Sequence, residues 1–131
     1  MPETILLVDD DPLSRKSISL FLGEEGYRVR EASDGIEALE YLKNDSFDLI
    51  LSDIFMPRCN GFGLLEEAKK MSPHTAVIFM TAYPTSDPRT IASSLGVEAL
   101  IRKPLLFEDL REKIERVLRK EELAKRTINS H

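Results

Sequence analysis

The sequence has few of the features that mark exported, membrane-spanning or nucleic-acid-binding proteins. It holds one cysteine, Cys59, which has no disulfide partner within the chain and fits a reducing compartment. The first residues lack the basic stretch and apolar segment of a signal peptide, and no apolar run approaches the ~20 residues that a membrane helix needs. We therefore expect a cytoplasmic protein that does not enter a membrane.

Basic residues are in the minority, with 18 lysines and arginines against 23 aspartates and glutamates among 131 residues. No basic cluster occurs before the last third of the chain, so we do not expect this segment to bind nucleic acid itself. Hydrophobic residues make up 42% of the chain, which is enough to bury the core of one domain.

Short apolar runs bounded by Asp, Pro, Gly or Ser dominate the hydrophobic pattern. Runs of this length without alternation predict strands covered on both faces, as in a parallel sheet. They span residues 5–8, 49–51, 76–80 and 99–101. A fifth segment, 27–32, alternates and carries three charges, which predicts an edge strand. Apolar residues at helical spacing predict helices between and after the strands, over 12–23, 34–42, 61–71, 87–95 and from about 107 onward.

This alternation of strands and helices predicts an α/β fold, in which helices cover both faces of a doubly wound, five-stranded parallel sheet. The common strand order for such a sheet is 2-1-3-4-5, which agrees with a charged second strand at the edge. We expect the domain to cover residues 1–120, with 121–131 as a helical extension or tail. Ligands of such sheets bind beyond the carboxyl ends of the strands, at the switch point between strands one and three.

Polar side chains follow four of the predicted strands at the point where each ends. Asp9 and Asp10 follow the first strand, Asp53 the third, Thr81 the fourth and Lys103 the fifth. Crowded carboxylates repel one another, so that one keeps its proton near neutral pH unless a cation such as Mg²⁺ binds between them. A single loop aspartate more often caps a helix, but the coincidence at four strand ends favours one shared site.

The same residues have the chemistry needed for phosphoryl transfer. A carboxylate beside Mg²⁺ can attack a phosphoryl group and form an aspartyl phosphate, while the metal and an ammonium offset the charge of the transferred oxygens. Asp53 is the candidate nucleophile. Thr81 and Lys103 can then hydrogen-bond the new phosphoryl oxygens, and their movement would report phosphorylation to the neighbouring surface. The residues therefore indicate a switch.

Four motifs in chain order make the sequence similar to a known family. They are Leu7-Val8-Asp9-Asp10-Asp11, Asp53-Ile54-Phe55-Met56-Pro57 followed by Gly61, Met80-Thr81-Ala82, and Lys103-Pro104. Over about residues 4–120 the chain resembles the receiver domain of two-component response regulators, which has the flavodoxin-like 2-1-3-4-5 sheet order.

The resemblance implies a role for each residue of the expected site. Asp53 would be the phosphoacceptor. Asp10 and Asp53 would bind Mg²⁺ together with the backbone carbonyl oxygen of Phe55, and Asp9 would assist through a water molecule. Thr81 and Lys103 would contact the phosphoryl group, and the resemblance also implies a cis peptide bond after Lys103.

The resemblance also implies partners. The phosphoryl group would come from the phosphohistidine of a histidine kinase or a phosphotransfer protein. The domain would be a signalling switch rather than an enzyme, although it would take part in its own phosphorylation and slow self-dephosphorylation. Its output surface would be the fourth helix, fifth strand and fifth helix. This surface would form a homodimer or bind an output domain or protein that the sequence does not identify.

Three positions near the expected site modulate this interpretation. Receiver domains usually carry Tyr or Phe three residues before the lysine, an aromatic that moves inward on activation, whereas this chain has Leu100. Leu100 either acts as a smaller switch, or yields that role to Tyr83, or belongs simply to the core. Phe55 and Tyr83 flank the expected route of the attacking water, so two aromatics there predict slow loss of the phosphoryl group. The alternative is that both pack on surface neighbours without a kinetic effect.

Other functions fit the sequence less well. A Mg²⁺-dependent phosphohydrolase would carry its nucleophile after the first strand as Asp-x-Asp and would need a cap domain. Here the first strand ends in Asp9-Asp10-Asp11, and 131 residues leave no room for a cap. A nucleotide or flavin module would need a Gly-rich or hydroxyl-rich loop there, and the acidic run at 9–11 would repel its phosphate. A receiver that signals by binding without phosphorylation is compatible with Leu100, but the intact acidic residues, Thr81 and Lys103 argue against it.

Overall fold

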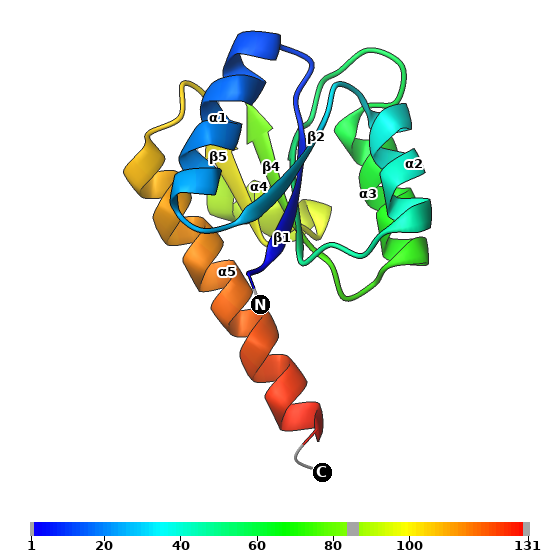
Figure 1. Ribbon diagram of the computed structural model, residues 1–131, viewed down its shortest axis with the longest axis vertical. Coiled ribbons are helices and arrows are strands. Elements are labelled where there is room, and N and C mark those ends of the chain that lie inside the picture. Colours follow the sequence, from blue (N-terminus) through cyan, green and yellow to red (C-terminus); the bar gives the residue numbers. More distant parts are fainter. Residues whose placement is uncertain (1, 84–86, 130–131) are drawn as a thin grey trace.

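The computed structural model describes residues 2–83 and 87–129, in which strands and helices alternate (Figure 1). The strands are β1 (Thr4–Val8), β2 (Arg28–Ala32), β3 (Leu49–Asp53), β4 (Ala76–Thr81) and β5 (Ala99–Arg102). The helices are α1 (Pro12–Glu24), α2 (Gly35–Asn44), α3 (Gly61–Met71), α4 (Pro88–Leu95) and α5 (Phe107–Asn129). Every element predicted from the hydrophobic pattern is present within a few residues of its expected bounds.

All strands of the sheet are parallel, and their order is β2-β1-β3-β4-β5, which confirms the prediction. The edge strand β2 alternates between exposed and partly buried residues until Ala32, whereas β3 and β4 are buried along their whole length. Because the carboxyl ends of parallel strands lie at one edge of the sheet, the residues that follow β1, β3, β4 and β5 meet there.

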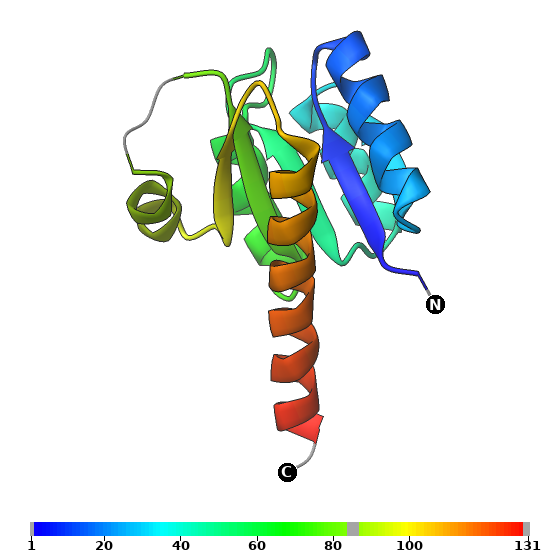
Figure 2. The same ribbon diagram turned by 90° about the vertical axis from the view of Figure 1, so that its left-hand side faces the viewer.

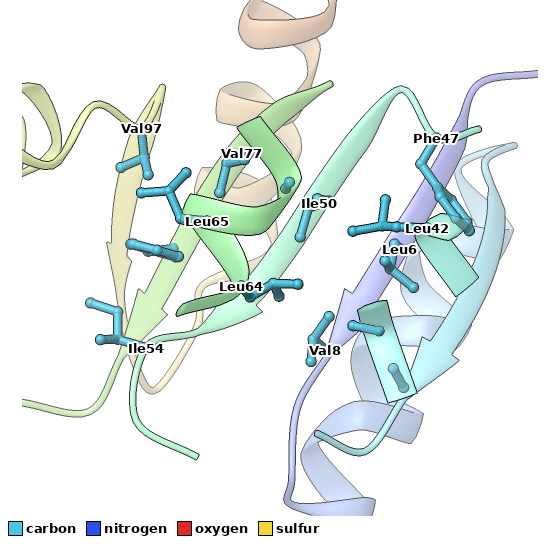
Figure 3. Close-up of a cluster of buried hydrophobic side chains, with 14 of the residues drawn as sticks. Leu6, Val8, Leu42, Phe47, Ile50, Ile54, Leu64, Leu65, Val77 and Val97 are labelled. Atoms are coloured by element: carbon cyan, nitrogen blue, oxygen red, sulfur yellow. The ribbon is translucent and has the colours of Figure 1, made fainter. Parts of the chain in front are cut away.

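Different helices cover the two faces of the sheet, as two views at right angles show (Figures 1 and 2). On one face, α2, α3 and α4 bury a cluster that includes Leu6 of β1 and Ile50 of β3 (Figure 3). On the other face, α1 and α5 bury the alternate residues, among them Ile5 and Leu49. Because both sets are apolar, these strands are continuous hydrophobic runs in the sequence.

Each of the helices α1 to α4 begins with a polar N-cap residue. Asp11 accepts a hydrogen bond from the backbone N–H of Leu13, and Pro12 occupies the first turn of α1. Asp34 caps α2, Asn60 caps α3 and Asp87 caps α4, each accepting from the backbone N–H three residues further along. A cap of this kind satisfies an otherwise unpaired backbone N–H and is worth about 1 kcal/mol. Asp11 therefore serves as a helix cap next to the acidic residues of the strand-end site.

The last helix continues past the body of the domain (Figure 2). Its first turns bury Leu110, Ile114, Val117 and Leu118 against the sheet. The helix then continues to Asn129, so the expected extension is helical over 121–129, and 130–131 lie outside the described residues. In the described part of the chain, no helix combines the length and the hydrophobicity needed to cross a membrane.

Candidate functional site

The predicted polar residues meet at the carboxyl edge of the sheet. They line a cavity of about 160 Å³. Its walls include Asp9, Asp10, Asp53, Thr81 and Lys103. Backbone hydrogen bonds extend the sheet into this edge, from the N–H of Asp9 to the carbonyl of Ala32 and from the N–H of Lys103 to the carbonyl of Thr81. The strand ends therefore hold these side chains in place.

Lys103 lies between the two acidic strand ends. Its Nζ atom is 3.0 Å from Oδ2 of Asp9 and 2.9 Å from Oδ1 of Asp53. A third acceptor, Oγ of Ser14, lies at 3.3 Å. Burial alone lowers the pKa of Lys103, but the hydrogen bonds and charges of Asp53 and Asp9 outweigh burial and raise that pKa above its ordinary value. The ammonium is therefore charged and offsets part of the negative charge. The peptide bond between Lys103 and Pro104 is cis, as expected.

Asp9 and Asp53 are both buried, with exposed fractions of 0% and 7%. Burial raises the pKa of Asp53 to about 7, and Asp9 acts in the same direction while Lys103 opposes it. Burial also disfavours ionisation of Asp9. Hydrogen bonds to its carboxylate, from Asp53 first, outweigh burial and hold the pKa of Asp9 below its ordinary value. Without a cation Asp53 thus keeps its proton until the pH approaches neutrality, in agreement with the repulsion expected from the sequence.

Asp9, Asp10 and Asp53 have the geometry of a cation site. Each offers one carboxylate oxygen, and these oxygens all lie within 4.8 Å of one another. Asp10 is exposed, which leaves the site open on one side, whereas Asp9 and Asp53 are buried. A donor set made only of oxygens, with an unfavourable excess of negative charge, fits a hard cation such as Mg²⁺.

Thr81 closes the β4 side of the cavity. Its side chain is buried, and its Oγ1 accepts a hydrogen bond from the backbone N–H of Tyr83 at 3.1 Å. A hydroxyl that accepts through its oxygen still has a proton to donate. Thr81 can therefore donate a hydrogen bond to a group bound beside Asp53.

Comparison with known proteins identifies the family to which a chain with this site belongs. The family model described as the response regulator receiver domain matches residues 5–115. The chain belongs to the receiver domains of two-component response regulators. The receiver domain protein (CheY-like) from Methanospirillum hungatei JF-1 has a similar crystal structure, with a TM-score of 0.86, 35% identity and coverage of 95% of this chain and 99% of that one.

Further relatives of this receiver domain include a metal complex. The response regulator TrrA from Thermotoga maritima, solved in complex with Mg(2+)-BeF, has a TM-score of 0.77 and 34% identity, with 88% of this chain and 98% of that chain covered. The response regulator MprA from Mycobacterium sp. (strain KMS) is 31% identical over 92% of this chain and 52% of the relative. The transcriptional regulatory protein GlrR from Escherichia coli (strain K12) is 38% identical over 79% of this chain. The chain spans about half the length of MprA and 23% of the length of GlrR.

Two exposed aromatic rings border the acidic cavity of the receiver domain. Phe55 and Tyr83 have exposed fractions of 53% and 63%. Their ring centroids lie 4.8 Å apart at an interplanar angle of 66°, in an edge contact. Phe62 of α3 adds a second edge contact to Phe55 at 6.1 Å. The structure thus brings into contact the two aromatics that the sequence placed beside the expected route of water, whereas ligation of a metal by the Phe55 carbonyl stays a prediction.

Leu100 is a core residue in the described structure. It is 3% exposed and belongs to the cluster buried under α2, α3 and α4. The roles that the sequence left open for this position, a smaller switch or simply a core residue, stay predictions. Leu100 and Tyr83 both line a groove of about 1020 Å³ beside α4, β5 and α5, and Tyr83 also lines the acidic cavity.

Sequence reasoning missed two features of the receiver domain. One is Ser14, whose position five residues after Asp9, in the first turn of the following helix, is a usable signal. The other is the attachment of the β3–α3 loop to α2. There Arg58, with a left-handed φ of 69°, contacts Oδ2 of Asp34 at 2.9 Å. Cys59 lies so close to Gly35 that a Cβ atom on the glycine would overlap the Cys59 carbonyl.

Proposed function

We propose that this receiver domain accepts a phosphoryl group on Asp53. Mg²⁺ would be held by Asp10, Asp53 and the Phe55 carbonyl, with Asp9 assisting through water. The observation that carries the proposal is the position of Asp53, with the Lys103 ammonium 2.9 Å from Oδ1 and the carboxylates of Asp9 and Asp10 within 4.8 Å. The phosphoryl group already carries negative charge, so a nucleophilic carboxylate needs nearby positive charge to receive it. The Lys103 ammonium and a Mg²⁺ ion held by the carboxylates would supply that charge.

The reaction follows from these contacts. A carboxylate oxygen of Asp53 attacks the phosphorus of a phosphohistidine, a P–O bond forms, the P–N bond breaks, and the imidazole nitrogen leaves with the electron pair and takes up a proton. Bound Mg²⁺ would supply a positive charge against the transferred oxygens. Lys103 already carries a proton and turns toward the new oxygens, and the Thr81 hydroxyl donates to one of them.

The phosphodonor would be a histidine kinase or a phosphotransfer protein. The protein would act in the cytoplasm. The output surface would be the face of α4, β5 and α5, where a groove of about 1020 Å³ can take a second copy of the chain in a homodimer or another protein. Tyr83, Ala82 and Lys103 border both this groove and the acidic cavity. Because Tyr83 lines both the cavity and the groove, whereas Leu100 lines the groove but not the cavity, Tyr83 is the residue through which we expect phosphorylation to alter the groove.

Slow self-dephosphorylation is part of the proposal. Hydrolysis needs a water molecule in line with the acyl phosphate, and Phe55 and Tyr83, whose rings contact each other, both line the cavity. Excluding that water would prolong the phosphorylated state.

Intact-mass measurement after incubation with Mg²⁺ and acetyl phosphate tests the proposed phosphoacceptor. We expect one phosphoryl adduct on the wild-type protein and none on Asp53→Ala. A matched control is Asp45→Ala, which removes a carboxylate that is about half exposed and contacts Arg30. An unmodified wild-type protein, or equal adducts on wild type and Asp53→Ala, would refute the proposal and favour a receiver that acts by binding alone.

A further inference from the structure

The ammonium of Lys103 is held by three elements of the fold. An ammonium has three N–H donors. Its acceptors are Asp9 after β1 at 3.0 Å, Asp53 at the end of β3 at 2.9 Å, and Ser14 in the first turn of α1 at 3.3 Å. The two carboxylates belong to the expected metal and phosphoryl site, whereas Ser14 belongs to neither.

We propose, on the basis of the proposed function, that Ser14 is a positioning residue for phosphoryl transfer, and that its hydroxyl holds Lys103 against the β1–α1 side of the cavity. The hydroxyl accepts from Lys103. Lys103 in turn contacts Oδ2 of the Asp9 carboxylate at 3.0 Å, so the ammonium that Ser14 contacts also pairs with Asp9. Ser14 thus reaches the acidic pair through the Lys103 ammonium.

The chemistry of a hydroxyl suits this position. Lysine is a flexible point charge, and directing its ammonium costs side-chain entropy that a fixed acceptor reduces. A third carboxylate would neutralise the ammonium and weaken its attraction to a phosphoryl group, whereas a hydroxyl orients it and leaves its charge available. The Lys103 side chain is 19% exposed, so water replaces a lost acceptor only in part.

Ser14 keeps its role after transfer. When Asp53 becomes an acyl phosphate, one of its oxygens is bonded to phosphorus and the contact with Lys103 at 2.9 Å has to change. Asp9 and Ser14 are then the unmodified acceptors that keep the ammonium beside the new phosphoryl oxygens. Loss of the hydroxyl should slow phosphorylation by about three- to tenfold, which is the effect of one hydrogen bond in a partly buried site.

The test compares phosphorylation rates by intact mass with acetyl phosphate and saturating Mg²⁺. We expect Ser14→Ala to be about three- to tenfold slower than wild type, and Ser14→Thr, which retains the hydroxyl, to restore most of the rate. The control is Ser17→Ala, an exposed serine one turn further along α1. In a Lys103→Met background, Ser14→Ala should have no further effect, because the hydroxyl acts through the ammonium.

A second readout does not depend on phosphorylation. In ¹H–¹⁵N NMR spectra, we expect the Lys103 ammonium signal to be visible in wild type and Ser14→Thr, and broadened by solvent exchange in Ser14→Ala. An unchanged rate and an unchanged signal in Ser14→Ala would overturn the role of Ser14, as would a full additional loss of rate in the Lys103→Met background. Absence of any adduct on wild type would instead refute the phosphoacceptor role of Asp53, and the NMR comparison would still test the contact.

Discussion

Replacing Asp53 with asparagine should stabilise the metal-free protein at high pH. Burial raises the pKa of the Asp53 carboxyl to about 7 in the folded protein, against an ordinary value of 3.8. Between about pH 4 and pH 7 the folded protein therefore holds a proton that the unfolded chain has released, and stability falls as the pH rises through this window. At about 1.4 kcal/mol for each pKa unit, ionised Asp53 costs the metal-free fold about 4 kcal/mol at pH 8.

The amide of Asp53→Asn has the shape of the carboxylate but no charge, so this cost disappears. Part of the gain is lost because Lys103 then has one carboxylate partner, Asp9. We expect a net stabilisation of about 2–4 kcal/mol at pH 8, or roughly 10 °C in Tm for a domain of this size. Near pH 4 the two proteins should have nearly equal stability, since wild-type Asp53 is protonated there.

Thermal and urea unfolding of both proteins in EDTA, at pH 4.5 and pH 8, measures this difference. Adding Mg²⁺ at pH 8 should stabilise the wild type and have a smaller effect on Asp53→Asn, because a metal ligand has been lost. Asp45→Asn serves as the control for a surface carboxylate. A variant no more stable than wild type at pH 8, or a difference that does not depend on pH, would refute the reasoning.

Three further predictions concern the core and the loops beside the site. Gly35→Ala should lower the free energy of unfolding by about 1–3 kcal/mol in urea titrations, because the added methyl overlaps the Cys59 carbonyl; unchanged stability would contradict this close approach. Replacing Phe55 with Asn and Tyr83 with Glu should speed loss of the phosphoryl group, followed by intact mass after removal of the donor, and an unchanged decay would remove the shielding role. Phe79→Ala should cost about 3–5 kcal/mol, because this ring is fully buried under α3; a loss below about 1 kcal/mol would contradict its place in the core.

Much of the fold is encoded by local patterns. Apolar runs such as 49–51 and 76–80 become the buried strands β3 and β4, because a strand covered on both faces needs apolar residues at successive positions. The charged segment 27–32 becomes the edge strand β2 for the opposite reason. Asp9, Asp53 and Lys103 were predicted to meet because each ends a parallel strand, and their contacts confirm this.

Contacts between distant loops were not predictable in the same way. The edge contact of Phe55 with Tyr83 depends on the path of two loops and on side-chain rotamers, which no periodic pattern describes. The pairing of Arg58 with Asp34 likewise depends on a left-handed backbone conformation at Arg58 that the sequence does not announce. Such features come from packing after the elements have assembled.

The sequence by itself determined the order of elements, the residues at the strand ends and their chemistry, because backbone geometry places strand-end residues at one edge whatever the details of packing. The tertiary structure alone decided which partners they have. It placed Ser14 on the ammonium of Lys103 across 89 residues of chain. It buried Leu100, left Tyr83 at the junction of cavity and groove, and raised the pKa of Asp53 to about 7 through burial. Burial and through-space distance arise only when separate elements pack together, and they set the charge state of the site.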